Sequence, residues 1–285
     1  MPYSREISRD NKACIMFLLD QSYSMVEPLG QSNKRKCDEL ASAVNGWLLN
    51  MAIRASGDAG IRDWMDVGVI GYRTDQAANP IIEPILQGPL ANKPLVSITE
   101  IGNNPARIDS VVQQMHDEET GEMLEVPTDN PVWIDAYAEG STPMCHVFHY
   151  AHGILSQWIA AHPSSFPPIV IHITDGESQD GDPIPYAEAV KALATSDGNV
   201  LLFNCHLSMS AVQPFVFPAH DQGLPDDLAR TLFHMSSQLP EPFFRSALQE
   251  GYQIQQSARG MAFNADMVVL INFLDMGTRA AVQLR

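Results

Sequence analysis

Two apolar runs in this chain end at an aspartate. Residues 13–19 and 168–174 contain no Asp, Glu, Lys or Arg, and they are followed directly by Asp20 and Asp175. Continuous apolar runs of this length are typical of strands buried on both faces of a parallel sheet. Parallel strands need long crossover connections, which are usually helices. The feature therefore limits the chain to folds in which helices cover both faces of a sheet.

Helical patterns separate the strand-like runs along the rest of the sequence. The expected helices are residues 33–55, 143–161, 186–195, 226–238, 242–255 and 266–274, and the expected strands are residues 13–19, 66–72, 168–174, 200–206 and a short one near Met261. This alternation predicts an α/β fold with a doubly wound, mostly parallel central sheet flanked by helices, in a Rossmann-like arrangement. One core accounts for the length, so residues 1–285 are expected to form a single domain.

Residues 76–142 depart from this alternation. The segment begins with several prolines and glycines, and we expect an edge strand at residues 94–100, a helix at 108–115 and an acidic turn at 117–119. A connection of this length in a compact domain usually carries function or a small substructure of its own. We therefore interpret residues 76–142 as a partly folded elaboration on one rim of the sheet.

Composition excludes some partner classes. The formal net charge is −17, which disfavours binding to nucleic acid or to an anionic membrane surface. No apolar stretch approaches the roughly 20 residues that span a bilayer, and residues 1–12 do not resemble a secretory signal. Four cysteines are scattered without paired spacing. These features predict a protein of the reduced cytoplasm.

Oxygen-bearing side chains follow three of the expected elements. Asp20, Ser22 and Ser24 form an Asp-x-Ser-x-Ser string after the first strand, Thr142 precedes a long helix, and Asp175 follows a later strand. The string alone is also compatible with a helix cap or a turn. Adjacent strands would bring all three loops to the carboxyl edge of the sheet, where such folds bind ligands. The five side chains could then converge on one hard cation.

With these residues the chain resembles a von Willebrand factor A (VWA) domain with a complete metal-ion-dependent adhesion site (MIDAS). The resemblance covers most of the chain and departs from the family mainly in residues 76–142. It implies that Ser22, Ser24 and Thr142 supply hydroxyl ligands, and that Asp20 and Asp175 bind directly or through water. The implied cofactor is Mg²⁺, or Mn²⁺ or Ca²⁺, with a carboxylate of a partner protein as the sixth ligand.

The expected function is that of a metal-dependent protein-binding module and not of an enzyme. The chain is similar to intracellular, single-domain bacterial members of the family, found in signalling or stress-response sets beside a protein kinase and a phosphatase, which suggests those partner classes. The alternative is a Mg²⁺-dependent phosphohydrolase with Asp20 as nucleophile. Such enzymes typically need an acid two residues later, and this chain has Ser22 there.

Other candidate groups receive simpler interpretations. His146, His149 and His152 are spaced by three residues on an expected helix, so a zinc site is conceivable, but no further ligand is evident. We interpret them as core and surface histidines. Trp133 and Tyr137 lie in the elaborated segment near Thr142 and are candidates for contact with a partner. Movement of the last expected helix on ligand binding is a further hypothesis drawn from the family.

Overall fold

The structure is a computed structural model that describes residues 2–30, 33–58, 60–116, 123–208 and 213–283. Among these residues, the central sheet contains eight strands. Its order is β13-β14-β12-β9-β1-β4-β5, with β6 also paired to β4. The strands are β1 (Ala13–Asp20), β4 (Met65–Thr74), β5 (Pro80–Pro84), β6 (Val96–Ser97), β9 (Ile169–Thr174), β12 (Leu201–Leu207), β13 (Phe215–Val216) and β14 (Met261–Ala265). The pairs among β4, β1, β9, β12 and β14 are parallel, which confirms the predicted fold class.

Strand β1 lies at the centre because it can be buried on both faces. All eight of its residues are buried, and Ile15 pairs with Val67 of β4 on one side and Ile169 of β9 on the other. Alternate side chains of β1 enter two separate cores, as the two-residue period of a strand requires. An uncharged sequence is therefore needed along the whole strand until its last residue, Asp20.

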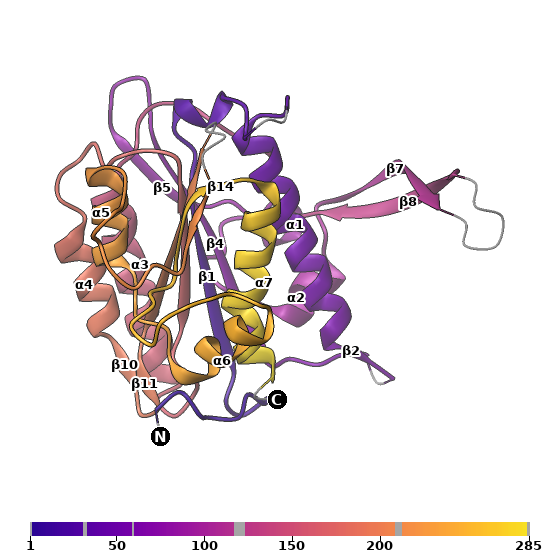
Figure 1. Cartoon of the computed structure of the whole chain (residues 1–285). Helices are drawn as coiled ribbons and strands as arrows, with labels where there is room; N and C mark the ends of the chain where they lie inside the picture. Colours follow the sequence, from indigo (N-terminus) through magenta and orange to yellow (C-terminus); the bar gives the residue numbers. More distant parts are fainter. Residues whose placement is uncertain (1, 31–32, 59, 117–122, 209–212, 284–285) are drawn as a thin grey trace.

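Helices cover both faces of this sheet (Figure 1). The core on one face includes residues of α1 (Lys36–Ala55), α6 (Glu241–Gln249) and α7 (Met267–Gln283). The other core includes residues of α3 (Met144–Ala161), α4 (Ile184–Ala192) and α5 (Asp227–Met235). In the part of the chain that is described, no helix is long and apolar enough to cross a membrane.

The direction of winding reverses between β1 and β9. The chain passes from β1 through α1 to β4 on one side, and later returns through α3 to β9 on the other side of β1. The two strands are adjacent and parallel, so their carboxyl ends form a topological switch point. The loops that follow Asp20 and Thr174 therefore begin side by side at one edge of the sheet.

The elaborated segment differs from its predicted structure. It contains β5, a 3-10 turn η2 (Gly88–Leu90), β6, α2 (Ile98–Asn103), β7 (Arg107–His116) and β8 (Met123–Val132). The predicted edge strand at 94–100 exists only as the two residues of β6, because the Ser97–Glu100 capping box starts α2 at once. The expected acidic turn at 117–119 lies outside the described residues.

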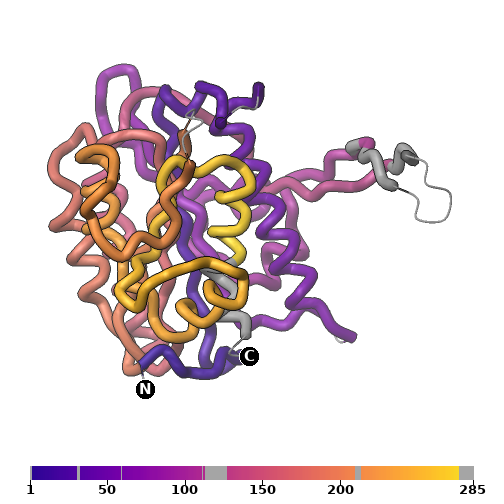
Figure 2. The backbone as a smooth tube through the Cα atoms, in the orientation of Figure 1, coloured from indigo at the N-terminus to yellow at the C-terminus, as the bar shows by residue number. Residues whose placement is uncertain are grey.

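The predicted helix at 108–115 is wrong. This segment belongs to β7, which pairs antiparallel with β8 over ten residues, from Arg107↔Val132 to His116↔Met123. Figure 2 shows this hairpin standing out from the rest of the molecule. Apolar residues at spacings of three and four can occur in strands as well as in helices, and β-branched residues such as Ile108 and Val112 favour the strand.

The described residues also contain several smaller elements. They are η1 (Tyr23–Val26), β2 (Ser56–Gly57), β3 (Gly60–Ile61), β10 (Ala194–Thr195) and β11 (Gly198–Asn199). Helix α4 ends at Ala192, earlier than expected, because the next residues form the β10–β11 hairpin. Helix α6 ends at Gln249, before Gly251 with its positive φ of 88°. Helix α7 extends nine residues beyond the predicted end at 274.

Candidate divalent-cation site

Asp20 is fixed by hydrogen bonds to both of its carboxylate oxygens. Its Oδ1 accepts from the backbone N–H of Ser22 at 2.8 Å, and its Oδ2 accepts from the Thr174 hydroxyl at 2.6 Å. Asp20 and Thr174 are both buried at the ends of the adjacent strands β1 and β9. The switch point therefore holds one buried carboxylate in a single orientation.

A chain of oxygen atoms continues from this loop to Asp175. The hydroxyl oxygens of Ser22 and Ser24 lie 3.1 Å apart, and Ser24 donates to Asp175 Oδ1 at 2.6 Å. The Asp175 side chain is 0% exposed, although it lies in the loop after β9. Four of the five predicted ligands, Asp20, Ser22, Ser24 and Asp175, thus lie on two loops that are in direct contact.

Backbone hydrogen bonds bring the loop of Thr142 to the same place. Glu139 N–H donates to Gln21 O at 2.7 Å, and Tyr23 N–H donates to Gly140 O at 2.9 Å. Thr142 itself is buried, and its carbonyl accepts from Gln179 N–H at 3.0 Å. The Thr142 loop is therefore attached to both of the other loops, and the structure brings all five predicted residues to one edge of the sheet.

Gly140 makes this approach possible. Its φ is +70°, in the left-handed region, and a Cβ built there would lie 2.1 Å from the backbone oxygen of Thr74. A side chain at this position would be strained and would also push the loop away from β4. The glycine two residues before Thr142 is thus required for the position of that residue.

A buried lysine is the one cation that contacts these acids among the described residues. Lys36, the first residue of α1, donates to Asp175 Oδ2 and to Glu27 Oε2, both at 2.8 Å, and its side chain is 4% exposed. Burial alone would lower the pKa of Lys36, but the hydrogen bonds to Asp175 and Glu27 raise it above the usual value. Lys36 is therefore a charged ammonium in contact with the site.

Negative charge at Asp20 is only partly compensated. Burial, and then the charge of Asp175, raise the pKa of Asp20 to about 6, although hydrogen bonds from Thr174 and Ser22 oppose the shift. A cation placed between the two carboxylates would favour the ionised form of both. Two carboxylates and three hydroxyls are a donor set for a hard cation such as Mg²⁺. The residues present therefore fit a divalent cation.

The histidines of α3 do not form a metal site with other residues that the structure describes. The described part of the chain contains no group of three or more His, Cys, Asp or Glu side chains suited to hold a metal ion. His146 Nδ1 lies 2.6 Å from Asp180 Oδ2 at the surface. Buried His172 is bonded through Nε2 to the Tyr72 hydroxyl at 2.7 Å and through Nδ1 to Asn204 Oδ1 at 2.8 Å. His146 and His149 are exposed and His152 is half-buried, so the interpretation of the three α3 histidines as surface residues holds and none of them lies in the core.

Sequence reasoning missed three residues of this site. Thr174 and Lys36 contact the acids directly, and Tyr23, between the two serines, is 68% exposed on the rim. The signal for Thr174 was its position at the end of β9, directly before Asp175. The prediction that Trp133 contacts a partner is wrong, since its side chain is buried and donates to Ile101 O. Tyr137 is exposed, and its role stays a prediction.

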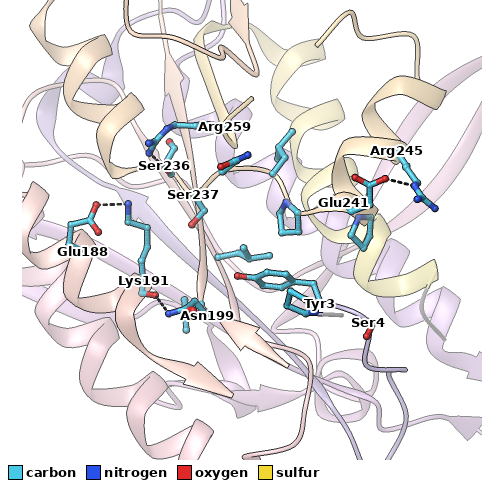
Figure 3. Close-up of a pocket in the computed structure, with 17 residues that line it drawn as sticks. Tyr3, Ser4, Glu188, Lys191, Asn199, Ser236, Ser237, Glu241, Arg245 and Arg259 are labelled. Atoms are coloured by element: carbon cyan, nitrogen blue, oxygen red, sulfur yellow. Dashed lines mark hydrogen bonds and ion pairs between the residues drawn. The ribbon is translucent and has the colours of Figure 1, made fainter. Parts of the chain in front are cut away.

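One large pocket lies away from this site. It has a volume of about 860 Å³ and is lined by residues such as Tyr3 and Leu201 at the amino end of β12, the opposite edge of the sheet (Figure 3). Its basic side chains already have partners: Lys191 contacts Glu188, Arg245 contacts Glu241, and Arg259 donates to the carbonyl of Ser236. None of the five predicted ligands lines it.

Neither a protein-family model nor a curated protein matches this sequence. Among solved structures, the chain is similar to the ArnB paralog VWA2 from Sulfolobus acidocaldarius, with 13% identity and a TM-score of 0.34 over 71% of this chain and 36% of that one. It is also similar to the PilB minor pilin from Streptococcus sanguinis, with 11% identity and a TM-score of 0.48 over 100% of this chain and 64% of that one. The chain thus spans less than two thirds of either protein.

Proposed function

We propose that this chain is a VWA-type module that binds a divalent cation and, through it, an acidic residue of a partner protein. The observation that supports the proposal is the continuous hydrogen-bonded set from Thr174 and Asp20 through Ser22 and Ser24 to Asp175. It lies at the switch point of a parallel sheet, with the Thr142 loop attached to it. Such a set presents oxygen ligands at the surface edge of an otherwise apolar core.

The proposed cation is Mg²⁺, with Mn²⁺ and Ca²⁺ as substitutes. Mg²⁺ prefers six oxygen ligands and usually keeps some water when proteins bind it. A carboxylate of the partner would replace one of these waters. At about 4 Å and an effective dielectric constant near 20, one charge pair contributes roughly 4 kcal/mol before desolvation is subtracted. This attraction is local, so the net charge of −17 does not prevent it.

The surroundings of the site favour a docking surface over a catalytic cleft. Tyr23 is exposed between two ligand residues, and Tyr137, 44% exposed, donates to Glu139 three residues before Thr142. Aromatic residues of this kind are frequent at the centres of protein interfaces. We propose that both side chains contact the partner. We further propose a cytoplasmic setting with a protein kinase or a phosphatase as partner, by analogy with the family that the sequence resembles.

We do not assign phosphohydrolase activity. Asp20 is buried and both of its oxygens accept hydrogen bonds, which fixes the carboxylate in one orientation toward a cation that it would hold directly or through water. Ser22 stands where a general acid would be needed and instead contacts Ser24. These arrangements suit the orientation of a ligand and not proton transfer.

Water relaxation on bound Mn²⁺ tests the proposal. The purified chain, stripped of metal, is loaded with Mn²⁺, and the relaxation enhancement of water protons is followed while acetate or an Asp-containing peptide is added. We expect the enhancement to fall as the carboxylate displaces a bound water, and the matched Asn-containing peptide to have no effect. Enhancement that is insensitive to every carboxylate would contradict the partner-bridging role.

A further inference from the structure

We propose that Lys36 is a tethered counter-cation of the candidate site, which competes with the divalent cation for Asp175 and favours binding of the partner's carboxylate. This inference rests on the proposed function and extends it to the regulation of metal affinity. Its basis is the position of the Lys36 ammonium, which donates a hydrogen bond to Oδ2 of Asp175, one of the predicted metal ligands.

The first observation is that each carboxylate oxygen of Asp175 already accepts a hydrogen bond. Its Oδ1 accepts from Ser24, and its Oδ2 accepts from Lys36 at 2.8 Å. A metal ion that binds this carboxylate must share it with a cation that is covalently attached to the same chain. Two cations drawn to one carboxylate repel each other, so each weakens the binding of the other.

The second observation is that Lys36 is placed where helix stability does not favour it. It is the first residue of α1, and the amino end of a helix favours acidic and not basic side chains. Its burial costs further solvation energy, which the contacts with Asp175 and Glu27 offset. Nothing in local helix formation explains a buried lysine there, whereas a role toward the acids of the site does.

The charges of the site indicate the consequence. Asp20, Asp175 and Glu27 contribute three negative charges and Lys36 one positive charge, so a bound divalent cation makes the group neutral. Without Lys36 the loaded site would keep one negative charge, which would repel an incoming carboxylate. Lys36 therefore weakens the binding of the metal ion and strengthens the binding of the partner's carboxylate. It couples the two binding events.

In the metal-free chain the same contact has a structural role. Lys36 reduces the repulsion between the two buried acids, and it ties the loop of Asp175 to the start of α1 and to Glu27, which follows η1. The site can then stay assembled before metal arrives.

Lys36→Met tests the inference against a merely structural role. The dissociation constant of Mn²⁺ is measured by electron paramagnetic resonance, together with circular dichroism to confirm folding. If Lys36 competes with the metal, Lys36→Met binds Mn²⁺ about tenfold more tightly than the wild type. If Lys36 only holds Asp175 in place, the variant binds Mn²⁺ more weakly, and the inference is overturned.

Two control variants separate local charge from other effects. Lys36→Arg keeps the positive charge, and we expect an affinity for Mn²⁺ within threefold of the wild type. Lys34→Met removes the same charge from a side chain that is 74% exposed near the same helix end, and it should also change the affinity less than threefold. A tenfold gain with Lys34→Met would show that the effect is general electrostatics, which would contradict the inference.

Acetate titration of the Mn²⁺-loaded proteins tests whether Lys36 favours binding of a partner's carboxylate. We expect the affinity for acetate to be several-fold lower in Lys36→Met than in the wild type. The outcomes also distinguish this inference from the proposed function. Absence of Mn²⁺ binding in both proteins overturns both. If the wild type and Lys36→Met bind Mn²⁺ equally well, the inference is overturned but the proposed function is not. If Lys36→Met binds Mn²⁺ and the wild type does not, the inference is supported in its strongest form.

Discussion

Thr174→Val removes the short hydrogen bond that holds Asp20, together with the longer contacts that the same hydroxyl makes with the backbone of Gly176 at 3.2 and 3.3 Å. The two side chains are nearly equal in size, but Val lacks the hydroxyl that donates to Asp20 Oδ2 at 2.6 Å. A hydrogen bond to a charged, buried acceptor contributes about 1.5–3 kcal/mol, and its loss leaves the acceptor unsatisfied. We therefore expect the free energy of unfolding of the metal-free chain to fall by about 2 kcal/mol at pH 8, measured by urea denaturation.

The loss of unfolding free energy in Thr174→Val should depend on pH because the pKa of Asp20 is raised to about 6. At pH 5 the folded chain carries Asp20 mostly in its neutral form, and a hydrogen bond to a neutral acceptor contributes only about 1 kcal/mol. Thr174→Ser keeps the hydroxyl and serves as the control, since its loss of one buried methyl should cost about 0.8 kcal/mol at either pH.

The same variant on an Asp20→Asn background completes the test. With no charge at position 20, Thr174→Val should cost about 1 kcal/mol at pH 8, which gives a coupling energy of about 1 kcal/mol between the two residues. The reasoning is refuted if Thr174→Val costs the same at pH 5 and pH 8 and the same with and without the Asp20 carboxylate.

Two further predictions concern the frame of the site. Burial lowers the pKa of His172 to about 4, so below about pH 6.5 the unfolded chain binds a proton that the folded chain does not. Stability should fall by up to about 3 kcal/mol between pH 6.5 and 4, and His172→Gln should remove that part of the slope in urea titrations; equal slopes would contradict it. Gly140→Ala should cost at least about 2 kcal/mol and weaken Mn²⁺ binding through Thr142, because the backbone must leave its φ of +70°; unchanged Mn²⁺ affinity would show that this loop does not position a ligand.

The parts of the site that local sequence determines were predictable. Strands β1 and β9 are buried on both faces, so an uncharged run that ends in an acid marks both the strand and its carboxyl end. The order of strands in the sheet then places Asp20 and Asp175 together. Thr142 follows from the same topology, since α3 is the crossover that leads to β9.

The features that were missed depend on contacts between distant residues. The β7–β8 hairpin is defined by the pairing of Arg107 with Val132, which a local pattern of apolar residues does not reveal. Lys36 lies in a segment correctly expected to be helical, but its burial between Glu27 and Asp175 is a tertiary contact. Charge at a helix end is usually solvated, so the sequence alone gave no reason to place this lysine in the site.

Calorimetric titration of the metal-stripped chain with Mg²⁺ tests the central claim most directly. We expect one site per chain, absent or at least tenfold weaker in Asp20→Ala and in Ser22→Ala. At a hundredfold excess over the dissociation constant, binding should add about 2.7 kcal/mol to stability. Absence of heat up to millimolar Mg²⁺, or a site that Asp20→Ala leaves unchanged, would contradict the account.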